Sequence, residues 1–497
     1  MQNSFLITNA PECGHGPHAG PTDHGHDAYE HASAVYAAMR QVDPHAVWVY
    51  QAWPWMRSFC AHGRPSAIGR DYMSNFTSAV PSGRLVLLDM HAEAVALWRL
   101  TDSFYNTSFV VEVMNDFGGT NGMFGDIAYM KKVVTDAAAL AGGAPTLAGA
   151  GISMEGIDQN APMYEAVLDG LWEHAGRSED EGLNTTAYLV QWGTQRCGKP
   201  LPAVQQAWVL LANTTYRPGT KPALGHRYCS NVNPSNNAWA NSGKGWTKSN
   251  SFWRGGWSRE EDVADYAAQL FRAWVLLAAS AGECNTTTSR FDVADVGREW
   301  LQTVSCVHAY TALFDAWHAP NRSATAVQAA GEALTDVLLD MDRLLSSVPG
   351  FLFGDWIRQA RALGQTNRSQ EQLVMAAKTQ VTDWASYPPG QPWSHAKVAE
   401  GKFSGIQDYA IKQWGGLIKT YQAVRVGMFV RQVVADARQN ASEVDVDSFT
   451  AAFKRRQLAW VQKPWDETEL PDHPVGDVSA ISKDLQAKYG SFGATKL

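Results

Sequence analysis

Residues 146–160 read TLAGAGISMEGIDQN, a run of small and aliphatic residues that leads directly into the carboxylate of Glu155. Three further short apolar runs precede it, at 46–53 (AVWVYQAW), 84–90 (RLVLLDM) and 108–117 (SFVVEVMNDF). Near-continuous apolar runs of this length are typical of strands that are buried on both faces of a parallel sheet. Because the segments between them can form helices, the first third of the chain predicts an α/β unit.

Each of these runs ends in a polar or aromatic residue. The four ends hold Trp53, Asp89, the pair Asn115 and Asp116, and Glu155. In a (β/α)8 barrel the catalytic residues lie at the carboxyl ends of the strands. The pattern therefore predicts part of such a TIM barrel, with its active-site edge at these residues.

From about residue 161 the hydrophobic spacing becomes helical. Apolar residues recur at intervals of three and four in six long segments, 262–280, 297–317, 326–347, 354–363, 417–437 and 448–461. This spacing predicts an all-helical second domain. Two loop-rich stretches, 216–246 and 386–405, interrupt it, and loops of that length are more often binding elements than fillers.

The bulk composition is that of a globular protein with more than one domain. The chain has 497 residues, 45% of them hydrophobic and 18% charged, and a formal net charge of −8. No Lys/Arg stripe is present, so we expect no nucleic-acid partner. No apolar run is long enough to cross a bilayer, so we expect no membrane partner.

Two features indicate a secretory lumen. Six cysteines are compatible with a few disulfides, although their spacing specifies no pairing. Eight Asn-X-Ser/Thr sequons, more than chance would give, begin at Asn75, Asn106, Asn184, Asn213, Asn285, Asn321, Asn367 and Asn440. The N-terminus MQNSFLITNAPECG lacks the features of a signal peptide, so we expect that the start of the protein lies upstream of Met1.

Residues 13–31 carry five of the fourteen histidines. Read chemically, this stretch offers a soft metal site. Its ligand spacing matches no defined motif, however, and we predict no metal ligands.

Several segments together resemble one family. They are RLVLLDMHAEAVALWRLTDSF (84–104), MNDFGGTNGMFG (114–125), GAGISMEGIDQN (149–160), FLFGDWIRQAR (351–361) and IQDYAIKQWGGLIKTY (406–421). They are similar to segments of the α-N-acetylglucosaminidases of glycoside hydrolase family 89 and occur in the same order as in that family. The resemblance implies a partial TIM-barrel catalytic domain over 1–160, with about five of eight strands, and an all-helical domain over 161–497 that completes the cleft.

The resemblance also implies an activity. Such an enzyme is a retaining glycoside hydrolase that removes terminal α-linked N-acetylglucosamine from glycans such as heparan sulfate, in a lysosomal, vacuolar or secreted location. It needs no cofactor. A retaining glycosidase uses two carboxyl groups about 5 Å apart. By the resemblance Glu155 is the nucleophile, and Glu12 is the nearest candidate for the acid/base, with Asn9 three residues before it.

Further positions are carried over individually as substrate-binding residues, and for each of them core packing is the alternative. They are Trp53, Met90, Met114, His226, Trp384, Ile406 and Tyr409. The alternative for the whole chain is a catalytically impaired carbohydrate-binding remnant of the same fold, in which the cleft persists without its acid. A glycan is the expected partner in both cases, and a homo-oligomer is compatible with both.

Overall fold

The structure is a computed structural model. It describes residues 28–53, 55, 67–116, 122–140, 146–155, 160–173, 183–218, 260–384, 406–407 and 412–493. The chain forms two compact units. The first comprises Met1–Phe117, Asp126–Glu155 and Ala161–Asn184, and the second comprises Gly118–Gly125, Gly156–Asn160 and Thr185–Leu497.

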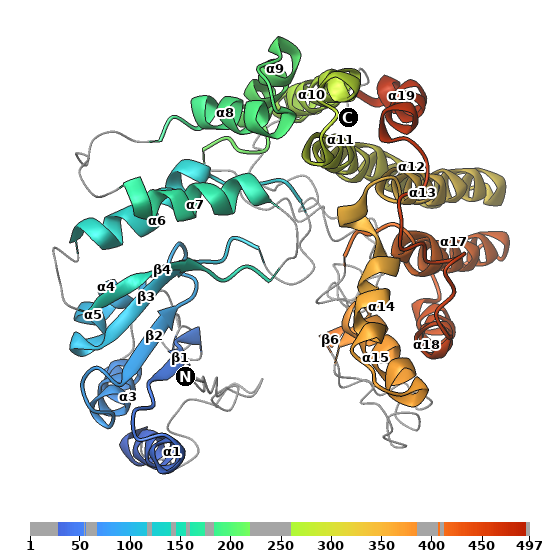
Figure 1. Cartoon of the computed structure of the whole chain (residues 1–497). Coiled ribbons are helices and arrows are strands. Elements are labelled where there is room, and N and C mark those ends of the chain that lie inside the picture. Colours follow the sequence, from blue (N-terminus) through green and yellow to red (C-terminus); the bar gives the residue numbers. More distant parts are fainter. Residues whose placement is uncertain are drawn as a thin grey trace. The chain divides into compact units, whose positions relative to one another are not determined.

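The first unit is built on a parallel sheet (Figure 1). Among the described residues its strands are β1 (Trp48–Gln51), β2 (Leu85–Asp89), β3 (Ser108–Val113) and β4 (Leu147–Ile152), in the order β1-β2-β3-β4. All neighbouring pairs are parallel, which confirms the predicted α/β arrangement. The fifth expected strand falls in the segment FLITNAPEC, which lies outside the described residues.

Helices alternate with these strands. They are α1 (Ala28–Val42), α3 (Ala67–Ser78), α4 (Leu97–Leu100), α5 (Asp102–Asn106), α6 (Ile127–Leu140) and α7 (Ala161–Glu173). α7 follows residue 160, where we expected the first domain to end, yet it contacts β4 and α6 and belongs to the first unit. The reason is topological, since the helix that follows a parallel strand packs back on the sheet.

The two faces of the sheet differ in burial. One face is buried and holds Trp48, Tyr50, Leu85, Leu87, Phe109, Val111 and Val113. On this face Trp48 packs on Phe76 of α3 and Phe109 on Trp98 of α4, with ring centroids 5.3 Å and 5.9 Å apart. The opposite face is partly exposed and holds Val49, Gln51, Val86, Leu88, Val110 and Glu112. This second face is the one that would line the interior of a closed barrel.

The second unit is mainly helical. Its helices are α8 (Thr185–Cys197), α9 (Pro202–Ala212), α10 (Glu260–Cys284), α11 (Thr287–Trp300), α12 (Cys306–His318), α13 (Ala324–Leu345), α14 (Phe353–Ala362), α15 (Asn367–Gln380), α17 (Ala423–Arg438), α18 (Val446–Gln462) and α19 (Val478–Tyr489). All six predicted segments are helical. Two of them, 297–317 and 417–437, also contain a π-helical turn. These turns are Leu301–Ser305, which joins α11 to α12, and Ile418–Gln422, which precedes α17.

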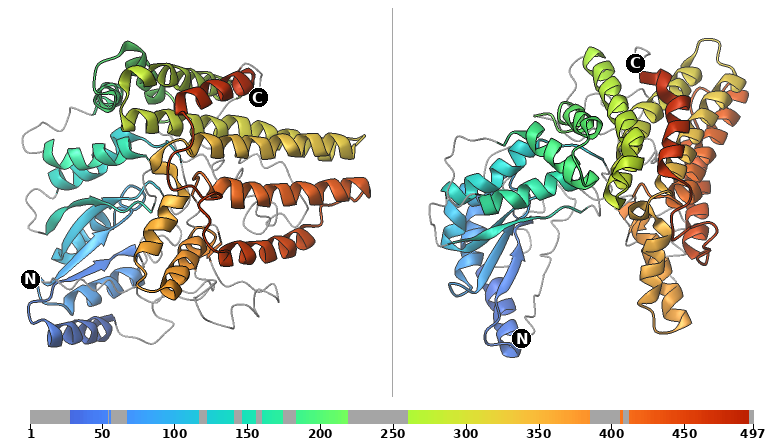
Figure 2. Two further views of the ribbon diagram at one scale, coloured as in Figure 1. Left: turned by 45° about the vertical axis from the view of Figure 1, so that its right-hand side comes forward. Right: turned by 45° about the horizontal axis from the view of Figure 1, so that its top comes forward.

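Close packing between long helices forms the core of this unit. α12, α13 and α17 lie side by side (Figure 2). A Cβ on Gly331 of α13 would come within 2.2 Å of the Val430 side chain of α17, so the helices can approach this closely only because residue 331 is glycine.

A two-stranded antiparallel sheet, which we did not predict, also belongs to the second unit. Its strands are β5 (Asp383–Trp384) and β6 (Ile406–Gln407), and Trp384 pairs with Ile406. Two residues that are 22 positions apart in the sequence are thereby held side by side.

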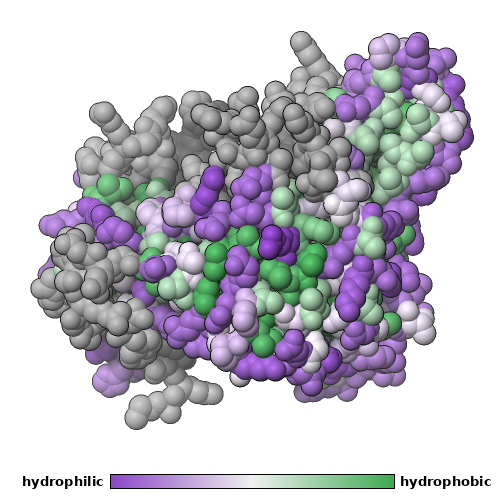
Figure 3. Space-filling model, turned by 90° about the horizontal axis from the view of Figure 1, so that it is seen from above, coloured by the Kyte–Doolittle hydropathy of each residue, from purple (hydrophilic) through white to green (hydrophobic). Residues whose placement is uncertain are grey.

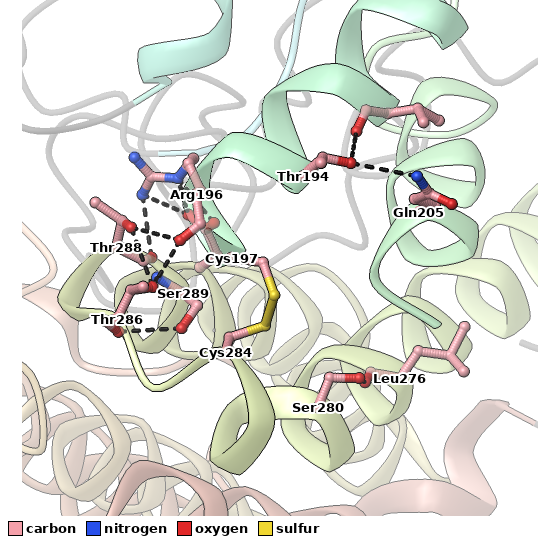
Figure 4. Close-up of a disulfide and its surroundings, with 12 residues drawn as sticks. Thr194, Arg196, Cys197, Gln205, Leu276, Ser280, Cys284, Thr286, Thr288 and Ser289 are labelled. Atoms are coloured by element: carbon pink, nitrogen blue, oxygen red, sulfur yellow. Dashed lines mark hydrogen bonds and ion pairs between the residues drawn. A yellow bond between two sulfur atoms is a disulfide. The ribbon is translucent and has the colours of Figure 1, made fainter. Parts of the chain in front are cut away.

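A disulfide between Cys197 and Cys284 joins the last residues of α8 and α10 (Figure 4). The sequence alone left this pairing open. The Arg196 guanidinium binds the Asp292 carboxylate next to it at 2.6–2.8 Å, and the Thr286 hydroxyl donates to the Arg196 carbonyl at 2.6 Å. Cys306 is disulfide-bonded as well.

Hydrophilic side chains cover most of the described surface on the face drawn in Figure 3, with hydrophobic ones in smaller groups between them. The large apolar residues most exposed to solvent, Val42 and Leu363, lie in separate units. Scattered exposure of this kind is normal for globular proteins. Within the described part of the chain, no helix combines the length and the apolar character needed to span a bilayer.

Candidate active site

The carboxyl ends of the four parallel strands lie at one edge of the first unit's sheet. Trp53 follows β1, Met90 follows β2, Met114 follows β3, and the segment 153–155 follows β4. Four of the predicted site residues, Trp53, Met90, Met114 and Glu155, are therefore brought to the same edge. In barrels and open α/β sheets this edge is where catalytic and binding residues gather.

The carboxylate of Glu93 organises the turn that follows β3. Its Oε1 accepts hydrogen bonds from the backbone amides of Met114 at 2.9 Å and Asn115 at 2.7 Å. The Nε2 of His91 lies 3.5 Å from the same oxygen. Asn115 adopts a left-handed φ of 53°, a conformation that asparagine tolerates better than most residues. Bonds between amides and a carboxylate are among the stronger hydrogen bonds in proteins, so this turn is firmly held.

The segment that carries Glu155 is tied to two neighbouring strands. The amide of Ser153 donates to the Val113 carbonyl at 2.9 Å, and the Ser153 hydroxyl donates to the Met90 carbonyl at 2.5 Å. The amide of Glu155 donates to the Asp116 carbonyl at 3.1 Å. Glu155 itself is exposed. Its backbone is fixed at the sheet edge while the residue is exposed, an arrangement that can present a carboxyl group to a ligand.

Two of the other predicted residues at this edge have different environments. The half-buried Trp53 stacks on His91, with ring centroids 6.1 Å apart and an interplanar angle of 24°. Met114 is buried, and its carbonyl accepts a hydrogen bond from the Tyr164 hydroxyl at 3.1 Å. Met114 therefore follows β3 at the active-site edge of the sheet and is at the same time packed as a core residue.

A buried and a half-buried carboxyl group in this unit have pKa values raised toward neutrality. Burial raises the pKa of Asp89 to about 7, although the hydrogen bond that its carboxylate accepts from the Trp98 amide acts in the opposite direction. The same hydrogen bond holds the start of α4. Burial likewise raises the pKa of Glu112 to about 7. Glu112 lies on the barrel-interior face and packs against Gly151, where an added Cβ would come 3.4 Å from its Oε1. Such a group can hold a proton at mildly acidic pH.

Sequence reasoning missed Glu112. The available signal was a lone charge inside the apolar run SFVVEV, at a position that alternates with the buried residues. A charged side chain at such a position must lie on the opposite face from Val111 and Val113.

The remaining predicted positions belong to the second unit or lie outside the residues that the structure describes. Trp384 and Ile406 are paired in β5 and β6, and the structure describes their backbone only. Glu12, His226 and Tyr409 lie outside the described residues.

The histidine-rich stretch adds no metal site to the described chain. Of its histidines the structure describes His31, which lies in α1 with its ring 6.5 Å from Phe76. Among the described residues, no group of three or more His, Cys, Asp or Glu side chains is arranged to hold a metal ion.

Solved structures share this fold. Two structures of a family 89 glycoside hydrolase from Clostridium perfringens, one in complex with its substrate GlcNAc-α-1,4-galactose and one with PUGNAc, match with TM-scores of 0.69 and 0.70. Each is 20% identical to this chain. The match covers 95% of this chain and 47% of the bacterial chain.

Human α-N-acetylglucosaminidase is 27% identical over 459 residues, which are 92% of this chain and 54% of the human protein. The chain thus spans about half the length of the relatives it matches. The family model for the α-N-acetylglucosaminidase TIM-barrel domain matches residues 17–174, and the model for the C-terminal domain matches residues 188–488. These matches confirm the predicted fold class, part of a TIM barrel followed by a helical domain. The chain belongs to the α-N-acetylglucosaminidase family.

Proposed function

We propose that this chain acts as a retaining glycoside hydrolase that removes terminal α-linked N-acetylglucosamine from glycans such as heparan sulfate. The observation that carries the proposal is the position of Glu155. It is an exposed carboxylate at the carboxyl end of a strand, with its backbone bonded to the end of the neighbouring strand. Family membership supports the choice of glycosidic bond.

In the proposed reaction a Glu155 oxygen attacks the anomeric carbon and forms a glycosyl ester. The bond between that carbon and the leaving oxygen breaks, and Glu12 gives its proton to the leaving oxygen. Glu12 then takes a proton from water, and the hydroxide attacks the same carbon and releases Glu155 as a carboxylate. Two inversions give net retention of configuration, and no cofactor takes part.

The substrate-binding role of the other predicted residues stays a proposal. Trp53, Met90 and Met114 would contact the sugar from the barrel edge, because they follow β1, β2 and β3 at the same edge of the sheet as Glu155. His226, Trp384, Ile406 and Tyr409 would contribute from the helical unit. The pairing of Trp384 with Ile406 supports a joint role for these two, since the backbone holds them side by side in spite of the long segment between them.

The proposed location is lysosomal, vacuolar or secreted, reached through the oxidising lumen of the secretory pathway. All eight sequon asparagines are exposed, as glycosylation requires. The disulfide between Cys197 and Cys284 also fits a secretory route.

Proton NMR on the full chain with an aryl α-N-acetylglucosaminide tests the proposal. We expect the α-anomer of N-acetylglucosamine to form first and the β-anomer to appear later by mutarotation. Initial formation of the β-anomer would contradict retention. Binding of the sugar without turnover would instead favour the carbohydrate-binding remnant.

A further inference from the structure

Two side chains in the turn after β2 connect the ends of three strands of the first unit. His91 and Glu93 lie in this turn, with side chains that are 17% and 6% exposed. The Glu93 Oε1 accepts hydrogen bonds from the amides of Met114 and Asn115 after β3, and the Nε2 of His91 lies 3.5 Å from the same oxygen. The His91 ring in turn stacks on Trp53, which follows β1. A continuous series of contacts therefore joins the end of β1 to the end of β3.

The backbone on both sides of Trp53 is held by neighbouring groups. The amide of Ala52 donates to the Leu88 carbonyl of β2 at 3.0 Å, and the amide of Trp55 donates to the Ala52 carbonyl at 3.1 Å. Trp55 is 2% exposed, and its ring lies 5.1 Å from that of Tyr50. These contacts fix where the Trp53 side chain begins. The rotation of its half-buried indole about the two side-chain bonds depends instead on what packs against the ring.

The His91 ring packs against this indole in a nearly parallel orientation. The ring centroids are 6.1 Å apart and the planes differ by 24°, which is within the range of favourable aromatic pairs. His91 is itself placed from two sides, because the next amide, that of Ala92, donates to the Glu112 carbonyl of β3 at 3.1 Å and the Glu93 carboxylate faces its Nε2. A ring that is held in this way can fix the plane of the indole on which it stacks.

We propose that His91 is a positioning residue for Trp53 and sets the plane in which the indole meets N-acetylglucosamine. The inference rests on the proposed function, in which Trp53 contacts the sugar. An aromatic ring stabilises a sugar only when its face packs on it, so an indole that rotates must be ordered when the sugar binds. An indole that is fixed beforehand loses less conformational entropy in this step. His91 should therefore strengthen sugar binding through Trp53 rather than by contact with the reacting atoms.

The test measures the affinity of the full chain for N-acetylglucosamine by calorimetry. This sugar is the product of the proposed reaction and is not turned over, so its Kd reports binding alone. Two variants of His91 separate the ring from its polar contact. His91→Gln keeps a donor for the Glu93 carboxylate and removes the ring, whereas His91→Phe keeps the ring and removes the donor. We expect Kd to rise about fivefold in His91→Gln and to stay within about twofold in His91→Phe.

His31→Gln is the matched control. His31 lies in α1 of the same unit, and its ring lies 6.5 Å from that of Phe76. The substitution therefore removes a histidine ring from an aromatic neighbour that is not a predicted sugar contact, and we expect Kd to stay within about twofold. All titrations are made well below the lowest thermal midpoint, so that unfolding does not contribute to Kd.

A double-mutant cycle tests whether His91 acts through Trp53. Trp53→Ala should itself weaken binding, and in this background His91→Gln should change Kd by less than about twofold. Steady-state kinetics with an aryl α-N-acetylglucosaminide give a second readout. In His91→Gln the KM should rise with Kd while kcat changes by less than about threefold, because a contact made equally in the ground state and the transition state affects binding alone.

The outcomes separate this inference from the proposed function. An unchanged Kd in His91→Gln, an equal loss in His91→Phe, or a further loss in the Trp53→Ala background would overturn the inference and leave the proposed function standing as long as Glu155→Gln is inactive. Turnover by Glu155→Gln would remove the proposed nucleophile, and the expected pattern of Kd would still support the role of His91 in binding. If the unmodified chain does not bind N-acetylglucosamine, both proposals fail together.

Discussion

The amide of Glu155 donates a hydrogen bond of 3.1 Å to the carbonyl of Asp116, so the ends of β4 and β3 are joined at the proposed nucleophile. Glu93 holds the preceding turn through the amides of Met114 and Asn115. The proposed site is therefore built on backbone bonds between adjacent strands, and its geometry depends on the groups that satisfy those amides.

Replacing Glu93 should destabilise the first unit. Glu93→Ala removes the acceptor of two backbone amides, and we expect a loss of about 2–4 kcal/mol in the free energy of unfolding. Glu93→Gln keeps an acceptor oxygen and should lose about 1 kcal/mol, which makes it the matched control. Urea unfolding measures both variants. Equal stability of Glu93→Ala and the unmodified chain would show that the turn does not depend on this carboxylate.

The pKa of Glu112 gives a pH dependence with a definite sign. Its pKa rises from 4.5 in the unfolded chain to about 7 in the folded chain because the group is buried. The folded state then binds more protons between these two values, so the free energy of unfolding should fall as pH rises from about 4.5 to about 7. Asp89, with a pKa raised to about 7 by burial, acts in the same direction.

Glu112→Gln should reduce this dependence to the part that Asp89 contributes, since the amide imitates the protonated acid at every pH. Thermal midpoints between about pH 4.5 and pH 7.5 measure the slope. Glu30→Gln removes one exposed carboxylate from α1 of the same unit and serves as the control. A slope equal to that of the unmodified chain would show that the pKa of Glu112 does not change on folding.

Loss of the disulfide between Cys197 and Cys284 should cost about 2–5 kcal/mol, because the bond closes a loop of 87 residues in the unfolded chain. The double variant Cys197→Ala, Cys284→Ala is a cleaner test than a reductant, since Cys306 is also disulfide-bonded and would be reduced too. We expect a lower thermal midpoint in the double variant. An unchanged midpoint would show that packing between α8 and α10 suffices.

Glycosylation should occur on exposed sequons when the protein is made in a eukaryotic secretory pathway. Enzymatic removal of N-glycans should then increase electrophoretic mobility, and peptide mass spectrometry should identify the sites among the eight asparagines. Replacing these residues by glutamine, one at a time, provides the control for each site. A protein that leaves the secretory pathway without any N-glycan would show that the sequons are not used, and they would then no longer support the proposed location.

Much of the fold could be predicted because its signals are local. The four strands follow from apolar runs bounded by polar residues, and the long helices from apolar spacing of three and four. The resemblance added the family, which the comparisons confirm. β5 and β6 could not be predicted in this way, because each is two residues long and their pairing joins positions far apart in the sequence.

The candidate site was predicted in part. The strand ends predicted Trp53 and Glu155. They did not predict that Glu93 accepts hydrogen bonds from the amides of Met114 and Asn115, because these bonds depend on the left-handed turn at Asn115. The hydrogen bond from the Ser153 hydroxyl to the Met90 carbonyl joins residues 63 positions apart, and no local pattern in the sequence indicates it. Contacts of this kind arise from tertiary packing.

The most direct test of the central claim is the turnover of an aryl α-N-acetylglucosaminide by Glu155→Gln in the full chain. The amide cannot form the glycosyl ester, so turnover should fall below a few per cent of the unmodified chain while the sugar still binds, as calorimetry would show. Glu12→Ala should by contrast regain activity with azide on a substrate with an activated leaving group. Turnover by Glu155→Gln close to that of the unmodified chain would contradict the assignment of the nucleophile.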